Sequence, residues 1–253
     1  AISECSNQME KGGDFALDFM RLLGTLSLKI GDYQTAKSLY EDVLAIKAQP
    51  WAQLGLAKSL TQLKQYDEAK VMFDEVLSKN GRVMEAYDWL AKTHTAQAEY
   101  AAAQAILQNA VNLSPTIVNR QKALGDVAHK NKDFDVAEQA LRDTISLAKY
   151  SFWRDAGDYA QLSKVQLDKG DVDAAKKTVS EIRRDFKQDP QAAMLSYVME
   201  ANVSQKLGDP VAAKLALDMA EKQLTVIGDK VPDQYALEFA EACYKGGRDE
   251  AAS

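Results

Sequence analysis

The sequence predicts an all-α protein built as a linear array of about seven helical hairpins. A short pattern returns along the chain: a small or polar turn, often an aromatic residue, two spacers and an alanine. The alanines fall at positions 36, 69, 103, 137, 175, 213 and 251, so the steps are 33 or 34 residues at first and 38 later. Self-similarity at such a period is typical of a repeat array, in which each hairpin buries its apolar face against its neighbours.

Apolar residues on both sides of each turn follow the helical period. Around the first turn, at Gly31 and Asp32, they are Phe15, Phe19, Leu22, Leu23, Leu26 and Ile30 before it, and Leu39, Tyr40, Val43 and Leu44 after it. Such spacing places these side chains on one face of each helix. Two amphipathic helices joined by a short turn form an αα-hairpin, so each repeat is expected to be one hairpin.

Small residues are expected where the two helices of a hairpin cross. The repeated alanine lies early in the second helix, and a larger side chain there would push the helices apart. Twelve residues earlier another small residue recurs: Gly24, Ala57, Ala91, Gly125, Ser163 and Ala201. We therefore expect Ala103 to be buried against the preceding helix near Ala91.

The steps between the alanines divide the array into two parts. Residues 1–13 are expected to be a linker or the remnant of a preceding segment. Residues 14–149 hold four repeats of 33–34 residues, separated by helix breaks such as Pro50, Asn80–Gly81 and Ser114–Pro115. Residues 150–253 hold longer repeats of 38 residues, of which the last is truncated. The seam between the two parts is expected at 150–157.

Composition and charge narrow the function classes. The 253 residues carry a net charge of −6, which argues against nucleic-acid binding driven by bulk charge. No run of about 18 apolar residues and no signal peptide occur, so no membrane partner is expected and a cytoplasmic location fits. Cys5 and Cys243 lie near opposite ends of the array, so a disulfide between them is not expected and a reducing compartment fits.

The repeats resemble the tetratricopeptide repeat family, which has a Leu-Gly pair, a Tyr, an Ala, a late aromatic and a closing Pro at a period of about 34 residues. The first pair corresponds to Leu23–Gly24, Leu56–Ala57, Leu90–Ala91 and Leu124–Gly125, the late aromatic to Tyr40 and Phe73, and the closing Pro to Pro115. Leu107 and Leu141 depart from the aromatic position. The resemblance covers roughly 14–253 and is looser in the last three repeats. It implies a right-handed superhelical solenoid whose first helices line a concave groove.

A narrower resemblance concerns the first four repeats. The segments Trp51–Ala57, Glu85–Ala91 and Leu113–Gly125 are similar to the repeat region of bacterial response regulators. Those proteins carry a phospho-receiver domain before their repeats, and no receiver pattern occurs in this sequence. The resemblance therefore implies the output region of a regulator in a two-component phosphorelay.

Catalytic and metal-binding patterns are sparse, so we expect no enzyme activity, no cofactor and no metal site. His94 and His129 lack a second ligand at metal spacing on the same helix face. His94 occupies the core Tyr position of the family, which favours a packing role. Asp126 and His129 are three residues apart and are expected to form a plain ion pair on one helix. The Gly-Asp pairs at the turns indicate helix caps rather than calcium loops.

The candidate binding site is the groove that the family resemblance implies. In the first four repeats the groove-facing positions supply Arg21, Lys29, Trp51, Lys58, Trp89, Lys92, Asn119, Lys122, His129 and Lys130, with Asp18, Glu85, Asp88 and Asp126 among them. Six Lys or Arg against four carboxylates leave an excess of about +2, whereas the whole chain carries −6. This favours an acidic or amphipathic peptide whose anchor meets Trp89, flanked by Lys58, Lys92 and Lys122. A solvated charged face without a ligand is the alternative.

The function expected is a non-enzymatic protein–protein interaction scaffold. Chaperone-binding members of the family hold a terminal carboxylate with basic and Asn side chains, and the matching positions here are Arg21, Thr25, Gly55, Glu85 and Trp89. Only Arg21 has suitable chemistry, so a receptor for chaperone tails is disfavoured. Two other readings stay open: an assembly factor of a secretion or pilus system, and a repeat region that self-associates through its open C-terminal end.

Overall fold

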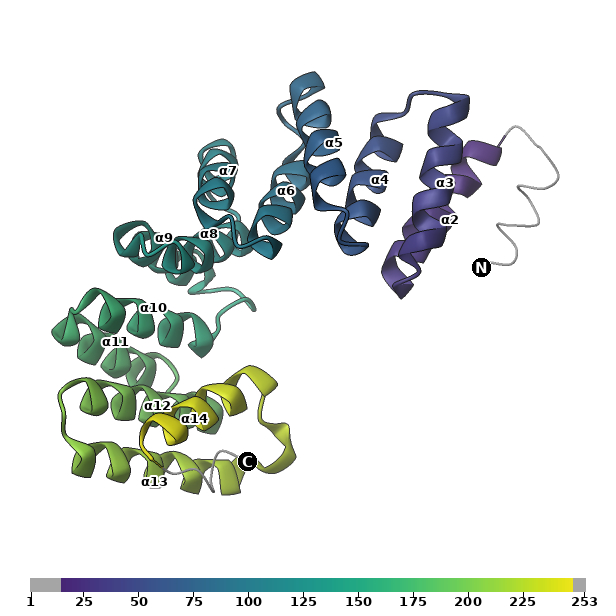
Figure 1. Cartoon of the computed structure of the whole chain (residues 1–253). Coiled ribbons are helices and arrows are strands. Elements are labelled where there is room, and N and C mark those ends of the chain that lie inside the picture. Colours follow the sequence, from purple (N-terminus) through teal and green to yellow (C-terminus); the bar gives the residue numbers. More distant parts are fainter. Residues whose placement is uncertain (1–14, 248–253) are drawn as a thin grey trace. The chain divides into compact units, whose positions relative to one another are not determined.

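The computed structural model of the protein describes residues 15–247, and over that range it confirms the predicted array of α-helices (Figure 1). Thirteen α-helices and no strand occur in these residues. The helices are α2 (Ala16–Ile30), α3 (Tyr33–Ile46), α4 (Pro50–Gln62), α5 (Tyr66–Lys79), α6 (Met84–Ala96), α7 (Tyr100–Leu113), α8 (Val118–Lys130), α9 (Phe134–Ala148), α10 (Ala156–Lys169), α11 (Val172–Asp185), α12 (Pro190–Lys206), α13 (Pro210–Ile227) and α14 (Asp233–Lys245). A short 3-10 helix, η1 (Gly228–Lys230), precedes α14.

Each repeat is one hairpin, and its turn has a fixed backbone geometry. The pairs run from α2–α3 to α12–α13, and α14 corresponds to the first helix of the seventh repeat. Each of the six turns contains one residue in the left-handed region, which is glycine in three repeats, as at Gly31 with φ of 84°. Lys64, Ala98 and Lys132 take the same place in the other three. A side chain in this region costs about 1 kcal/mol or more, so the repeat geometry overrides the local preference there.

Aspartates after the turns cap the second helices, as the Gly-Asp pairs predict. The side chains of Asp32, Asp133, Asp171 and Asp209 each accept a hydrogen bond from the backbone N–H three residues later. Such a bond satisfies one of the amides that a helix leaves unpaired at its start, and it stabilises the helix by about 1 kcal/mol.

The repeated alanines and their small partners are buried, which confirms the predicted packing. The alanines at 36, 69, 103, 137, 175 and 213 all lie in the core, and Ala251 lies outside the described residues. All six small residues twelve places earlier are buried too. Ala103 and Ala91 are 0% and 2% exposed, so neither crossing position has room for a larger side chain.

The chain forms two compact units, one up to Pro115 and one from Thr116 onward. Unit 1 holds α2–α7, and its largest core cluster is centred on Tyr40, Phe73 and Leu90. Unit 2 holds α8–α14, and its largest cluster joins α10 to α14 through residues such as Met199 and Phe239. This division concerns compactness, whereas the seam expected at 150–157 concerns the length of the repeats and stays a prediction.

The longer steps of the later repeats have two structural origins. Between α9 and α10 the chain runs through a connection at 149–155, which exposes the rings of Tyr150, Phe152 and Trp153. Further on the helices themselves lengthen, since α12 and α13 have 17 and 18 residues, against 13 to 15 in the helices of unit 1. A loop lengthens the first of these steps, and roughly one additional helical turn per helix lengthens those that follow.

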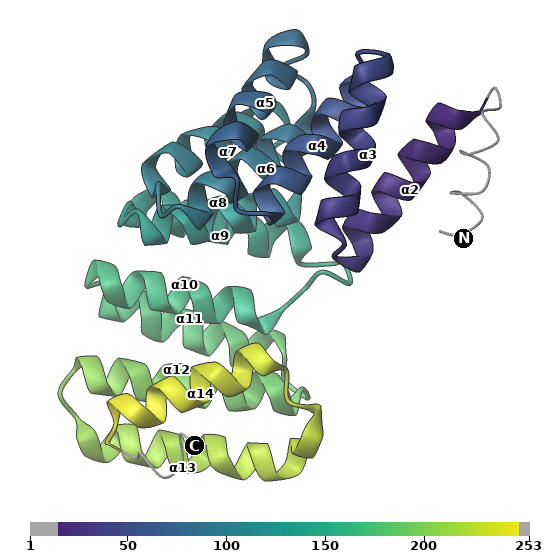
Figure 2. The same ribbon diagram turned by 45° about the vertical axis from the view of Figure 1, so that its right-hand side comes forward.

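Helix α14 lies along α12 in both ribbon views (Figures 1 and 2). The connection before it, from Gly228 through η1 to Pro232, joins the sixth hairpin to α14 and contains a short 3-10 turn. Side chains of α14 contact α10 as well as α12, so the helix covers the faces of two earlier first helices in unit 2.

Candidate binding groove

Unit 1 contains a groove with a volume of about 440 Å³, formed by the first helices of its three repeats. Its walls are Arg21, Thr25, Leu28 and Lys29 of α2, Trp51, Leu54, Gly55, Lys58 and Gln62 of α4, and Glu85 and Trp89 of α6, with Tyr40 of α3 beneath them. All of the first-helix residues lie 18, 15, 14, 11, 8 or 7 residues before the repeated alanine of their hairpin. These are the positions at which the family resemblance implies side chains that face the groove. The structure thus brings Arg21, Trp51, Lys58 and Trp89 together around one hollow.

Two tryptophans of this groove each lie against cations. The guanidinium of Arg21 lies 5.4 Å from the ring centre of Trp51. The Trp89 ring has the Lys92 ammonium at 4.5 Å and the Lys58 ammonium at 6.0 Å. Contacts of this kind stabilise exposed sites by about 0.5–1 kcal/mol. Both indoles are half-buried, so part of each ring remains available to solvent.

Tyr40 forms the floor of the groove, and two glycines make room for it. Its ring meets Trp51 edge-on, with ring centres 6.3 Å apart. A β-carbon placed on Gly24 or on Gly55 would lie 2.8 or 2.4 Å from Cζ of Tyr40. Burial raises the pKa of the Tyr40 hydroxyl, and a hydrogen bond with Thr25 offsets part of that shift.

One of the cations that line the groove is already paired. The Lys58 ammonium is paired with the Glu85 carboxylate across α4 and α6. A partner's carboxylate would therefore compete with Glu85 for Lys58, while Arg21 and Lys92 sit on the tryptophan faces. Lys29 completes the basic rim of the α2 wall.

Asn119, Lys122, His129 and Lys130, four of the predicted groove residues, lie on α8, in unit 2. Asn119 and Lys130 are exposed there. The Lys122 ammonium pairs with Asp158 at 2.6 Å and with Asp155 at 3.7 Å. Burial alone would lower the pKa of Lys122, but the hydrogen bond to Asp158 and the neighbouring carboxylates outweigh it and raise the pKa. Lys122 is thus an ion-pair partner within unit 2, and its expected place beside Trp89 stays a prediction.

Both histidines have carboxylate partners. His94, expected to pack in the core, is half-buried and hydrogen-bonds Glu99 in the following turn, and this bond lowers the pKa of Glu99. His129 pairs through Nε2 with Asp168 of α10 at 2.7 Å, so its partner is on another helix rather than the expected Asp126. Burial raises the pKa of Asp126. Among residues 15–247 no cluster of three or more His, Cys, Asp or Glu side chains is arranged to hold a metal ion.

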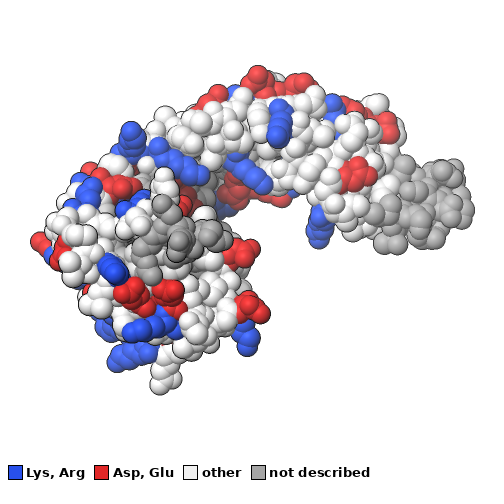
Figure 3. Space-filling model, turned by 60° about the horizontal axis from the view of Figure 1, so that its bottom comes forward, with Lys and Arg blue, Asp and Glu red and all other residues white. Residues whose placement is uncertain are grey.

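On the face drawn in Figure 3, Lys and Arg side chains are interspersed with Asp and Glu side chains. No helix in the described part of the chain is long and apolar enough to cross a bilayer. Cys243 is buried, and Cys5 lies outside the described residues, so the expected absence of a disulfide stays a prediction.

Sequence reasoning found the groove walls but missed its floor and its internal pairing. Leu28, Leu54 and Tyr40 contribute apolar surface that the charge count ignored. The signal for Tyr40 was the pair Gly24 and Gly55, because two helical glycines opposite one aromatic ring indicate a close approach.

Comparisons with known proteins agree with this architecture. The family model described as tetratricopeptide repeat matches residues 28–88. No curated protein matches the chain in a sequence comparison.

Similar solved structures share the fold at low sequence identity. MamA from Desulfovibrio magneticus has 18% identity and a TM-score of 0.59, with 70% of this chain and 98% of that chain covered. PilF of Pseudomonas aeruginosa has 17% identity and a TM-score of 0.59, with 90% and 96% covered. YrrB, described as a repeat protein with an unusual peptide-binding site, has 16% identity and a TM-score of 0.57, with 74% and 92% covered. The family model thus matches residues 28–88, and the solved structures show that the chain shares their fold.

Proposed function

We propose that this chain is a non-enzymatic scaffold that holds a peptide segment of a partner protein in the groove of unit 1. The observation that carries the proposal is the pair of half-buried tryptophans, Trp51 and Trp89, each with a cation on its ring and both facing the same hollow of about 440 Å³. Aromatic and arginine side chains in such positions dominate the binding energy of many protein interfaces. The peptide-binding site in the name of YrrB adds support from a similar fold.

The chemistry of the groove defines the peptide it would take. Its apolar surface, made by the two indoles with Leu28 and Leu54, suits one aromatic or aliphatic anchor. Its rim carries Arg21, Lys29 and Lys92, which suits carboxylates beside that anchor. A short acidic peptide with a single bulky apolar residue satisfies both requirements. Rim cations are expected to act mainly on the association rate and its salt dependence.

Selection from a peptide library tests the proposal. The whole chain is used to select binders from random twelve-residue peptides, and the best peptide is titrated by calorimetry into wild type, Trp89→Ala, Trp51→Ala and the control Trp153→Ala. Each groove variant should lose about 2 kcal/mol or more of binding energy, which is about thirtyfold in Kd. Trp153 lies in unit 2, so its variant should bind like wild type. Unchanged affinity of both groove variants would show that the groove is not the site.

The role in the cell is a further part of the proposal. The segments around Trp51, Trp89 and Pro115 are similar to the repeats of bacterial response regulators, so we place the chain as the cytoplasmic output region of a two-component phosphorelay. A receiver domain encoded upstream of Ala1 would support this role. If that receiver is present, phosphorylating it with acetyl phosphate should change the affinity of the selected peptide. An upstream region without a receiver pattern would count against it.

A second role is favoured by one comparison. PilF of Pseudomonas aeruginosa shares the fold over 90% of this chain, and an assembly factor of a pilus or secretion system is the corresponding alternative. A signal peptide followed by a lipid-attachment cysteine upstream of Ala1 would support that role in place of the phosphorelay. Gene deletion separates the two as well, because an assembly factor is required for surface pili, whereas an output region is required for a transcriptional or motility response.

A further inference from the structure

Helix α14 presents one apolar face to the inner side of unit 2. Tyr235, Phe239 and Cys243 follow one another at intervals of four residues and are all buried. Residues four apart lie on the same side of a helix, so the three form a continuous stripe. The opposite side remains open, with Leu237 at 60% and Tyr244 at 72% exposure. The helix is therefore seated like an amphipathic ligand rather than surrounded like a core helix.

Tyr235 anchors one end of this seat. Its hydroxyl donates to the Asp155 carboxylate and accepts from the backbone N–H of Gly157 at 3.0 Å. The ring lies close to the start of α10, because a β-carbon on Gly157 would be 3.3 Å from Cε1 of Tyr235. Asp155 also lies 3.7 Å from Lys122, so the anchor extends the ion-pair network of α8 and α10.

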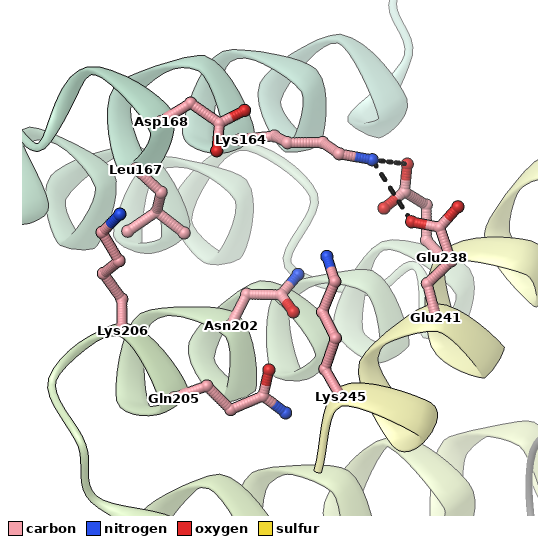
Figure 4. Close-up of a pocket in the computed structure, with 9 residues that line it drawn as sticks. All are labelled: Lys164, Leu167, Asp168, Asn202, Gln205, Lys206, Glu238, Glu241 and Lys245. Carbon is pink, nitrogen blue, oxygen red and sulfur yellow. Dashed lines mark hydrogen bonds and ion pairs between the residues drawn. The ribbon is translucent and has the colours of Figure 1, made fainter. Parts of the chain in front are cut away.

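Carboxylates of α14 meet a lysine of the inner face (Figure 4). The Lys164 ammonium lies 3.6 Å from Glu238 and 3.4 Å from Glu241. On α12, the amide of Gln205 donates to the carbonyl of Ala242 at 2.9 Å. Side chains of α10 and α12 thus recognise both the charge and the backbone of the helix that covers them.

These contact residues are the unit 2 counterparts of the groove in unit 1. Lys164 lies eleven residues before its repeated alanine, as Lys58 and Lys92 do in theirs. Gly157 and Trp51 both lie eighteen residues before the repeated alanine of their hairpin, so they occupy equivalent positions. The inner face that is open in unit 1 is therefore occupied in unit 2 by the chain's own helix.

The seat is incompletely filled. A hollow of about 280 Å³ remains between α10, α12 and α14, and its walls include Lys164, Lys206 and Lys245 with Asn202 and Gln205 (Figure 4). Asp168, Glu238 and Glu241 line the hollow as well, and Lys164 is paired with both glutamates. Lys206 and Lys245 have no ion-pair partner among the described residues, so α14 adds a second cation beside Lys206 where a carboxylate would pair with it. A helix with an acidic residue at that place would meet the same surface with better charge complementarity.

We propose that the inner face of α10 and α12 is a helix-binding surface, that α14 is its internal ligand, and that a partner helix of the same pattern displaces α14. The pattern has two aromatic residues four positions apart, as Tyr235 and Phe239 are, and glutamates three and six positions after the first aromatic residue. It also has a carboxylate at the position of Lys245. The connection of Gly228, η1 and Pro232 is the hinge about which α14 leaves. This proposal does not depend on peptide binding in unit 1.

Binding of a designed helix to the full chain tests the proposal. The probe is a fluorescein-labelled peptide of residues 231–247 that carries Lys245→Glu, and its anisotropy is measured with wild type and with Tyr235→Ala/Phe239→Ala, which loosens the internal helix. The peptide should bind the double variant about tenfold or more tightly than wild type, because it no longer competes with α14. Adding Lys164→Glu to the double variant should weaken binding about tenfold, while the exposed control Lys177→Glu on α11 should leave it unchanged.

A second readout needs no substitution in the chain. Excess peptide should accelerate hydrogen exchange of the α14 amides, residues 233–245, in the wild-type protein and leave those of α5 unchanged. The proposal is overturned if exchange of α14 does not change at peptide concentrations that saturate the double variant, or if no binding to either chain occurs. It is also overturned if Lys164→Glu and Lys177→Glu have equal effects. If the wild-type protein is a dimer and the peptide converts it to a monomer, the inner face of α10 and α12 binds α14 of a second copy. That result would refute a separate partner.

Discussion

Adding a methyl group at Gly55 should destabilise unit 1, because the floor of the groove has no room for it. The new β-carbon would lie 2.4 Å from Cζ and 2.6 Å from Cε1 and Cε2 of Tyr40. That ring is 3% exposed, and Gly24 approaches the same ring closely, at a distance of 2.8 Å from its own ideal β-carbon, so the ring has little space into which to retreat. Overpacking of this kind costs about 1–3 kcal/mol.

The helix itself responds in the opposite direction. Alanine is a better helix former than glycine by about 1 kcal/mol in a helix interior. Three ring atoms inside 2.7 Å place the steric cost in the upper part of its range, so we expect a net destabilisation of about 1–2 kcal/mol for Gly55→Ala. In urea this corresponds to a midpoint lower by about 0.5–1 M, followed by circular dichroism and by indole fluorescence.

Two further variants separate steric overlap from a general glycine effect. At Gly81 an added β-carbon meets its nearest atom at 3.7 Å, so Gly81→Ala should leave the midpoint unchanged. In a Tyr40→Leu background the overlap at position 55 is relieved, so Gly55→Ala should cost less there than in wild type. If Gly55→Ala unfolds at the same urea concentration as wild type, or a higher one, the floor of the groove is not built as described.

Three other predictions concern packing, pH and charge. Ala103→Leu should cost about 1–3 kcal/mol, measured by urea unfolding, because the repeated alanine is fully buried at its helix crossing. Burial, with help from its hydrogen bond to Asp185, raises the pKa of Tyr159 to about 12. Its contribution to stability is therefore complete below pH 10 and is lost between about pH 10 and 12, and Tyr159→Phe should flatten that decline. Glu85→Gln should release Lys58 and tighten binding of the selected acidic peptide about two- to fivefold at low salt.

Each of these predictions has its own control. Ala105→Leu lies on the exposed side of α7 and should be tolerated, so equal losses at both positions would show that the repeat register is misplaced. Tyr150→Phe removes an exposed hydroxyl and should leave the alkaline slope unchanged. Glu75→Gln, on the exposed side of α5, removes the same charge outside the groove. If Glu75→Gln raises the peptide affinity as much as Glu85→Gln does, the gain comes from the net charge of the protein and not from the release of Lys58.

The repeat period was sufficient to predict the turns, the buried alanines and the groove walls. This worked because small residues at a fixed spacing reflect one local constraint, the close crossing of two helices, that every repeat shares. Trp51, Lys58 and Trp89, chosen by counting back from the repeated alanines, line one hollow, and their role in binding stays a prediction.

What the period could not predict depends on contacts between repeats. The Lys58–Glu85 pair joins two helices whose charges were counted separately in the sequence. His129 finds its partner Asp168 in the next repeat, although Asp126 is nearer along the chain. The seat of α14 depends on the irregular connection at 228–232, where no repeat pattern applies. At the seam predicted at 150–157 the loop is longer, and the ring of Trp153 is tilted by 34° to that of Phe152 with ring centres 4.5 Å apart. The compact units divide after Pro115.

Fluorine NMR of the whole chain, labelled with 5-fluorotryptophan, tests the central claim most directly. The chain has three tryptophans, and only Trp51 and Trp89 line the groove, while Trp153 lies in the other unit. Titration with the selected acidic peptide should shift the resonances of Trp51 and Trp89 along one saturation curve and leave that of Trp153 in place. If Trp153 alone shifts, or if none of the three resonances moves while the peptide binds, the groove of unit 1 is not the binding site.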